Sequence, residues 1–331
     1  MDHFSIYHNG IPSFLLAACK APEMQRLRDV GMNCGCEYTS FPRFQRLAPY
    51  SRFDHSLGVA LIVWHFTQDP AQTLAGLLHD IATPVFAHVV DFLRGDYLRQ
   101  EATEAGTAEI IASSPALRAV LQDLSLTVED VSDYHRYPIA DNDAPRLAAD
   151  RLEYTLGNCI NYRIRSPETV RRYYSDLVIS RNEDGLPELA FQSGQTAEDF
   201  ALAALACSEI YVADEDRWSM QMLSELLRCA LSNDIITEKE LFTTEPKVIE
   251  KLRRSSRTAS QWESFRAMEQ MERCEMPPDE SWRKIHAKKR CIDPLIAECG
   301  RVSSYSQVFS EKLAEFRSRS QDYWIHGEAR R

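Results

Sequence analysis

The sequence lacks the features of membrane-spanning, secreted and general nucleic-acid-binding proteins. No run approaches the roughly 18 consecutive apolar residues that a membrane helix needs. The opening stretch, MDHFSIYHNGIPSFLLAACK, begins acidic and has neither the basic region nor the long apolar core of a secretory signal. The 38 Lys and Arg are outnumbered by 49 Asp and Glu, and the net charge of −11 argues against general binding to nucleic acid. We therefore expect a cytoplasmic protein with no membrane partner.

Cysteine pairs at the spacing of a zinc site are also absent. The nine cysteines are an odd number without a regular framework, and Cys34 and Cys36 form a lone C-x-C with no second pair. This pattern indicates reduced thiols, with Cys34 and Cys36 in a structural role. Glycine is sparse, at 12 of 331 residues, and we find no repeat or low-complexity segment.

Apolar residues recur at helical spacing over much of the chain, whereas strand signals are few. Helices are predicted at 21–30, 55–67, 71–80, 101–112, 142–160, 196–231 and 305–319. Short strand signals occur at 176–180 and 291–297. A hydrophobic share of 44% is ample for a core. We predict a mainly α fold with at most a small β-hairpin or sheet.

A loop-like passage at 181–197 suggests a division of the chain. We expect an N-terminal helical core over 1–190 and a mostly helical C-terminal region, 191–331, that packs on it. The charged stretch 251–290, which Pro277 and Pro278 interrupt, is predicted to be a surface or mobile segment.

Ionisable residues end one of the apolar helices, in LLHDIATPVFAH at 77–88. Burying them costs free energy unless a partner pairs with them. Asp54 is predicted to cap a helix that starts at about His55, and a second helix returns to end near Asp80. At about 1.5 Å of rise per residue, such an antiparallel pair brings His55 close to His79 and Asp80.

A further helix offers a second carboxylate. In DNDAPRLAADRLEYTLGNCI, Asp150 is expected mid-helix beside the small residues Ala148 and Ala149. Two imidazoles and two carboxylates suit an open divalent-metal site better than a closed structural zinc site. Such an ion lowers the pKa of a bound water and polarises a phosphoryl oxygen. The alternative is that the His-Asp dipeptide, which is common in proteins, is an ordinary hydrogen-bonded helix end.

Taken together, these residues resemble the HD-domain superfamily of metal-dependent phosphohydrolases. Its pattern of His, then His-Asp, then a distant Asp within a helix is matched by His55, His79, Asp80 and Asp150. The segments APEMQRLRDV, SRFDHSLGV, LLHDIATPVFAH and DRLEYTLGN look most like the deoxynucleoside triphosphate triphosphohydrolase branch. The resemblance covers about residues 20–160. It implies an HD-domain helical bundle that holds one divalent ion (Mn, Fe, Co, Ni, Mg or Zn) on these four residues.

The chain departs from that branch at positions that bear on the reaction. Thr83 and Gln100 stand where the branch has histidines, and neither has a useful pKa near neutrality. The resemblance places His88 over the substrate phosphates, which leaves His88 and Glu101 as the catalytic candidates. The Gln-Leu-Gly that helps select the sugar is replaced by GMNCG, so the deoxynucleotide substrate is not carried over.

Three residues are expected to bind substrate: Arg52, Thr83 and Tyr154. Arg52 and Tyr154 match positions that approach phosphate or sugar in the family. The basic run RKIHAKKR at 283–290 resembles a feature near the phosphate pocket of that branch, and fits an exposed face equally well. The expected partner is a phosphate-bearing small molecule, a nucleotide first of all, and we expect a homo-oligomer.

The resemblance thus implies a metal-dependent phosphohydrolase that uses metal-activated water on a nucleotide or another small phosphate ester. The absence of histidine at Thr83 and Gln100 motivates an alternative, a catalytically weak HD scaffold that binds or senses a nucleotide. A di-iron oxygenase that also uses His88 and His135 is less favoured, because the customary spacing of the extra histidines is not met.

Overall fold

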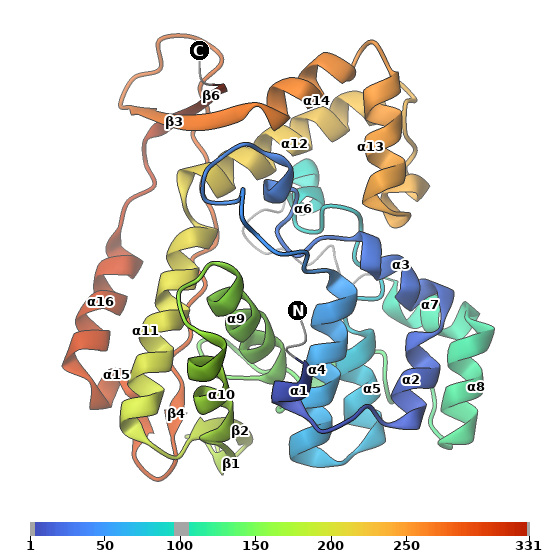
Figure 1. The fold of residues 1–331 in the computed structure, drawn as a ribbon, viewed down its shortest axis with the longest axis vertical. Coiled ribbons are helices and arrows are strands. Elements are labelled where there is room, and N and C mark those ends of the chain that lie inside the picture. Colours follow the sequence, from blue (N-terminus) through green and yellow to red (C-terminus); the bar gives the residue numbers. More distant parts are fainter. Residues whose placement is uncertain (1–3, 96–105, 330–331) are drawn as a thin grey trace.

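The computed structural model describes residues 4–95 and 106–329. These residues form sixteen α-helices and six short strands (Figure 1). The mainly α class is confirmed, and the β structure consists of two small sheets. None of the described helices is both long and apolar enough to cross a bilayer.

The first ten helices lie before the first strand. They are α1 (Phe4–Tyr7), α2 (Ser13–Cys19), α3 (Pro22–Arg26), α4 (Arg52–Thr67), α5 (Pro70–Leu78), α6 (Val89–Arg94), α7 (Thr107–Ser113), α8 (Pro115–Asp123), α9 (Ala149–Asn161) and α10 (Pro167–Ser175). The later helices are α11 (Gly194–Tyr211), α12 (Asp214–Ser232), α13 (Glu245–Arg254), α14 (Ala259–Arg266), α15 (Val302–Tyr305) and α16 (Gln307–Ser318).

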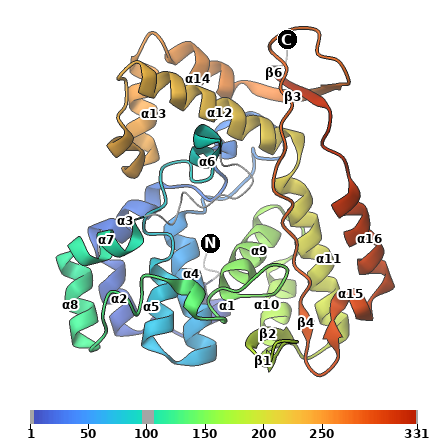
Figure 2. The ribbon, with the colours of Figure 1, turned by 180° about the vertical axis from the view of Figure 1, so that it is seen from behind.

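The strands form one four-stranded and one two-stranded sheet. The larger has the order β1-β2-β4-β5, from Leu177–Arg181, Pro187–Phe191, Leu295–Ile296 and Gly300–Arg301. Only its β2–β4 pair is parallel. In the smaller sheet, β3 (Met268–Cys274) pairs antiparallel with β6 (Trp324–Ala329). The two sheets lie at opposite ends of the molecule (Figures 1 and 2).

Helices α4 and α5 form the antiparallel pair that the sequence predicts. Ser51, rather than Asp54, is the N-cap of α4, and Asp54 completes a capping box by accepting from the Ser51 N–H. The two helices pack closely at Gly76, where a Cβ would lie 3.3 Å from a Val59 methyl and 3.4 Å from a Val63 methyl. His79 and Asp80 directly follow the last residue of α5.

Helix α9 begins at Ala149, not at residue 142. The Asn142 side-chain amide donates to the carbonyls of Pro138 (3.0 Å) and Leu147 (3.1 Å), which holds the preceding residues in turns. Asp150 consequently lies in the first turn of α9, so its predicted mid-helix position is wrong.

The helix predicted over 196–231 is two helices. Helix α11 ends at Tyr211 and α12 starts at Asp214. The first turn of α12 carries Asp214, Glu215 and Asp216, and acidic residues stabilise a helix N-terminus.

Two hydrophobic cores hold the elements together. One lies among α2, α4, α5, α8 to α11 and α16, and the other lies among α6, α12, α13, α14 and the β3–β6 sheet. Residues after 190, such as Phe200, belong to the first core, and residues before 190, such as Phe41 and Phe86, belong to the second. The division into 1–190 and 191–331 stays a prediction, and each core draws on both parts.

Most residues of the stretch 251–290 are exposed, as predicted for a surface segment. The stretch nevertheless contains α14 and β3, and Trp262 and Phe265 are almost fully buried in the second core. The nine cysteines are free thiols, as expected, and Cys34 and Cys36 are buried in the same core. The predicted helix at 101–112 is described only from α7 onward, since residues 101–105 lie outside the described part of the chain.

Candidate metal centre

Two imidazoles and two carboxylates converge where α4, α5 and α9 meet. Nε2 of His55, in the first turn of α4, lies 3.0 Å from Oδ1 of Asp150 and 3.9 Å from Oδ2 of Asp80. Nε2 of His79 lies 3.7 Å and 3.6 Å from the same two oxygens. The four side chains that the sequence singles out are therefore brought together by three separate helices.

The cluster is buried and compact. His55, His79 and Asp80 each offer a ligand atom within 4.8 Å of the others, and no other group of three or more His, Cys, Asp or Glu does so in the described residues. All three are less than a tenth exposed. Asp150 adjoins them from α9 through its contacts with both imidazoles.

Both histidines have Nδ1 engaged and Nε2 directed at the carboxylates. Nδ1 of His79 donates to the carbonyl oxygen of Gly76 at 2.7 Å, and Nδ1 of His55 lies 2.6 Å from Oε2 of Glu153. A metal-binding histidine is held in the same way, with its second nitrogen on a backbone carbonyl or a carboxylate. The donor set and its orientation therefore fit a divalent cation.

Charge in the cluster is arranged around Asp80. Burial raises the pKa of Asp80, but the positive charges of Arg52, His79 and His55 outweigh it and hold that pKa well below the ordinary value. Burial lowers the pKa of His55, and its bonds to Asp150 and Glu153 reverse this and raise it to about 10. The surroundings of His55 thus favour positive charge.

Two of the predicted substrate-binding residues contact Asp80. Nη1 of Arg52 donates to Oδ2 of Asp80 at 2.9 Å, and Oγ1 of Thr83 donates to Oδ1 at 2.7 Å. Both side chains are buried. In this structure they orient the carboxylate, and their contact with a substrate stays a prediction.

His88 is held by a fully buried carboxylate. Its Nδ1 lies 2.9 Å from Oδ2 of Asp91, and the turn before it has positive φ at Phe86 (58°) and Ala87 (46°). Burial, with the charges of Arg290 and Arg52, lowers the pKa of His88, and Asp91 opposes that shift. Neutral imidazole is therefore favoured at neutral pH.

Of the remaining predicted site residues, the structure describes Tyr154 but not Glu101. The ring of Tyr154 lies 6.4 Å from the ring of His55, and burial raises its pKa to about 12. The charge of Arg290 acts on Tyr154 as well as on His88, which brings the end of the basic run 283–290 near the cluster. Glu101 and Gln100 lie outside the described residues.

His135 does not join the cluster. Its Nδ1 lies 2.7 Å from Oδ2 of Asp141, while the neighbouring Tyr134 stacks near His79, with ring centroids 5.0 Å apart. Neither His88 nor His135 belongs to the compact ligand group of the described residues. No observation of the site favours a second iron.

Sequence reasoning missed two residues that contact the metal-centre side chains. Tyr134 lies over the His79 ring and Glu153 contacts His55. Glu153 could have been found from the sequence, because it follows Asp150 by three residues and so shares its helix face. Tyr134 could not, since its contact with His79 depends on how the 3₁₀ turn Tyr134–Arg136 meets α5.

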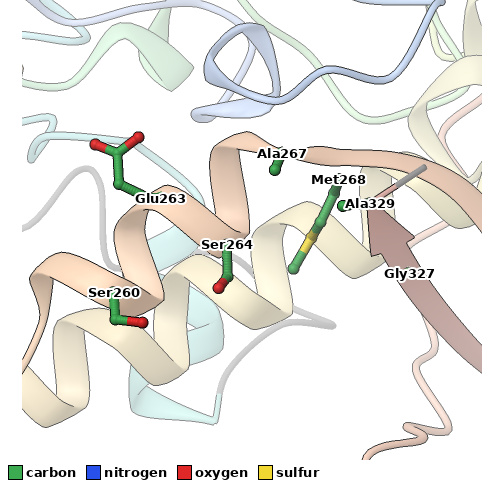
Figure 3. Close-up of a pocket in the computed structure, with 7 residues that line it drawn as sticks. All are labelled: Ser260, Glu263, Ser264, Ala267, Met268, Gly327 and Ala329. Carbon is green, nitrogen blue, oxygen red and sulfur yellow. The ribbon is translucent and has the colours of Figure 1, made fainter. Parts of the chain in front are cut away.

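A cavity of about 460 Å³ lies elsewhere, along α14, β3 and β6 (Figure 3). Its lining includes Ser260, Met268 and Gly327. Its only ionisable side chain is Glu263, which forms an ion pair with Arg266 at 3.3 Å. A single carboxylate that is already paired does not make a metal site, so the cluster described above is the candidate centre.

The chain is similar to two curated proteins and to a solved structure. It is 27% identical over 206 residues to YdhJ of Bacillus subtilis, a match that spans 62% of each chain. It is 26% identical over 297 residues to the metal-dependent phosphohydrolase cns2 of Cordyceps militaris, which covers 85% of this chain and 79% of cns2. No family model matches the sequence.

One solved structure of similar fold is a phosphohydrolase from Bacteroides thetaiotaomicron. The superposition covers 97% of both chains with a TM-score of 0.65, at 15% sequence identity. This likeness shows a shared fold along nearly the whole chain.

Proposed function

We propose that the chain is a divalent-metal-dependent phosphohydrolase of HD type, with His55, His79, Asp80 and Asp150 as the metal ligands. The observation that carries the proposal is the convergence of these four side chains, in which both imidazoles direct Nε2 at the carboxylates. The similarity to a protein named metal-dependent phosphohydrolase over 85% of the chain supports the same activity.

The ion, when bound, supplies a water of lowered pKa and polarises a phosphoryl oxygen. The protein's own residues hold the ligands in place. The Gly76 carbonyl orients His79, while Arg52 and Thr83 fix the two oxygens of Asp80. Because these hydrogen bonds hold the ligands in place beforehand, the site has to reorganise less when the ion and substrate bind.

His88 is the proposed group for proton transfer. With its proton on Nδ1 against Asp91, the neutral imidazole presents Nε2 as a base or hydrogen-bond acceptor. Its lowered pKa keeps this form populated at neutral pH.

The proposed substrate is a phosphate-bearing small molecule, with a nucleotide as the first candidate. The charges of Arg52 and Arg290 both act on His88, so two guanidinium groups lie near that residue and would attract a phosphate. Tyr154, near the ring of His55, is the proposed contact for a sugar.

The first test is metal analysis of the purified protein and of Asp80→Ala, together with a phosphate-release screen over nucleotides and simple phosphate esters. We expect near-stoichiometric metal and hydrolysis in the wild type and loss of both in the variant. Asp293→Asn is a matched control, because this buried carboxylate accepts from Ser303, a residue outside the cluster.

Turnover that persists after the metal is removed would contradict the proposal. Stoichiometric metal with no hydrolysis of any ester would instead favour the nucleotide-sensing alternative, in which a nucleotide raises the melting temperature without being consumed.

A further inference from the structure

Glu153 is a fully buried carboxylate next to the candidate metal centre. It lies on α9 three residues after Asp150, so the two carboxylates point from one helix face. Oε2 of Glu153 lies 2.6 Å from Nδ1 of His55, and Oδ1 of Asp150 lies 3.0 Å from Nε2. The imidazole of His55 is thus bracketed by two carboxylates of the same helix.

Two tyrosines hold Glu153 in this position. The Tyr50 hydroxyl donates to Oε2, and the Tyr7 hydroxyl lies 3.4 Å from Oε1. Burial and the charge of Glu153 raise the pKa of both phenols well above the ordinary value, so both remain hydrogen-bond donors. A carboxylate removed from water is costly, and these donors with His55 compensate it.

The position of Glu153 determines which nitrogen of His55 carries the proton. A carboxylate accepts hydrogen bonds and donates none, so Nδ1 must hold the proton that lies between it and Oε2. Nε2 is then the nitrogen whose lone pair would bind an ion that also contacts Asp80 and Asp150.

We infer that Glu153 is a positioning residue of the metal centre, which fixes the tautomer and ring orientation of His55 for binding through Nε2. This inference rests on the proposed function, because it requires His55 to be a ligand. His79 obtains the same orientation from the backbone carbonyl of Gly76. A backbone carbonyl cannot be removed by a side-chain substitution, whereas Glu153 can be replaced. A substitution of Glu153 therefore tests the orientation of a ligand histidine while the histidine itself stays in place.

The experiment is Co²⁺ titration of the metal-stripped full-length protein, followed by visible absorption, for the wild type and three variants. Glu153→Gln keeps the size of the side chain and removes its charge. We expect it to weaken Co²⁺ binding by roughly 10- to 100-fold, as substitutions of such supporting groups do, and to change the cobalt spectrum. Tyr50→Phe leaves the carboxylate and should weaken binding less, in the same direction.

Tyr174→Phe is the matched control. Its buried hydroxyl donates to the backbone carbonyl of Tyr7 at 2.8 Å and makes no bond to Glu153 that the structure records. Loss of this bond should lower the urea midpoint of the metal-free protein, as we also expect for Tyr50→Phe, while Co²⁺ affinity and spectrum stay as in the wild type.

Binding by Glu153→Gln within twofold of the wild type, with an unchanged spectrum, overturns the inference and leaves the proposed function standing. Equal losses of affinity in Tyr50→Phe and Tyr174→Phe also overturn it, since they would reflect general destabilisation. If Glu153→Gln does not fold, the inference is tested by comparing the Co²⁺ affinities of Tyr50→Phe and Tyr174→Phe. Wild-type protein that binds no Co²⁺ would overturn the proposed metal function itself.

Discussion

At the scale of single residues, Gly58 determines how closely α9 approaches α4. A Cβ at this position would lie 2.5 Å from Oε1 and 2.6 Å from Cγ of Glu153. Glu153 cannot swing away without losing its bonds to His55 and Tyr50. The glycine therefore provides the space in which the buried carboxylate lies.

We expect Gly58→Ala to destabilise the protein and weaken its metal binding. Alanine gains up to about 1 kcal/mol of helix propensity, but overpacking against a held side chain costs about 1–3 kcal/mol. Gly76→Ala is the comparison, because its Cβ would meet two valine methyls at 3.3–3.4 Å. Urea unfolding and Co²⁺ titration should show Gly76→Ala close to the wild type, and equal behaviour of the two variants would contradict this account.

A second residue-scale prediction concerns the pH dependence of turnover through His88. Its pKa lies below the ordinary value of about 6.5, so kcat/KM should be level near neutrality and fall only at lower pH, as Nε2 gains a proton. Asp91 raises this pKa, so Asp91→Asn should move the acidic limb to still lower pH. His88→Gln should lose roughly 10²-fold in kcat/KM, together with that limb.

The exposed His286 is a suitable control for these profiles, since His286→Gln should leave both the rate and the limb unchanged. An acidic limb that persists in His88→Gln would assign the titration to another group.

At the scale of elements, α12 packs an acidic residue against the segment that carries Cys36. The Cys36 thiol donates to Oδ2 of Asp216 at 3.6 Å. Burial and the charge of Glu215 raise the pKa of Asp216 to about 8, although Cys36, Arg43 and Arg217 oppose the shift. The folded protein therefore holds a proton on Asp216 that the unfolded chain releases at much lower pH.

This difference predicts that stability decreases as pH rises toward 8. Between about pH 4 and pH 8 the folded state binds more protons than the unfolded state, so the free energy of unfolding falls with pH in that window. Asp216→Asn should remove this contribution. From pH 6 to pH 8 the wild type should lose about 2 kcal/mol more than the variant in urea unfolding.

The exposed Asp123 provides the matched control, and Asp123→Asn should follow the wild-type pH dependence. Parallel curves for wild type and Asp216→Asn would show that Asp216 does not hold its proton in the folded state.

The elements differ in how well the sequence predicts them. The α4–α5 pair follows from local signals, namely apolar periodicity and a chain break at Asp69 and Pro70. Strand β3, with the sequence MEQMERC, carries too many charges for a strand signal, and its partner β6 lies some 50 residues later. Such a pairing is set by tertiary contacts, because local propensity in strands depends strongly on what packs against them.

At the scale of the whole molecule, the two cores interleave the two halves of the chain. Helix α11 buries Ala197, Phe200 and Ala204 in the core that α4 and α9 share. Conversely, Phe86 and Val90 lie in the core that α12 and α14 build. The candidate metal centre lies at the first turns of α4 and α9, two helices that pack in the same core as α11.

We therefore expect residues 1–190 alone to lack a cooperative unfolding transition. The fragment would expose the faces that α11 and α12 cover, and it would lose much of the apolar burial that stabilises the fold. Circular dichroism during urea unfolding of the fragment and of the full chain tests this. A sharp transition in the fragment would support an independent N-terminal domain.

The sequence by itself determined the mainly helical class and the four candidate ligands. Helical periodicity is local, and His55, His79, Asp80 and Asp150 are marked by their order and by the breaks between their helices. The tertiary structure decided the orientation of those ligands, through the carboxylate of Glu153, the carbonyl of Gly76 and the guanidinium of Arg52. It also decided the two cores and the β3–β6 sheet, because these depend on contacts between residues far apart in the chain, which no local pattern records.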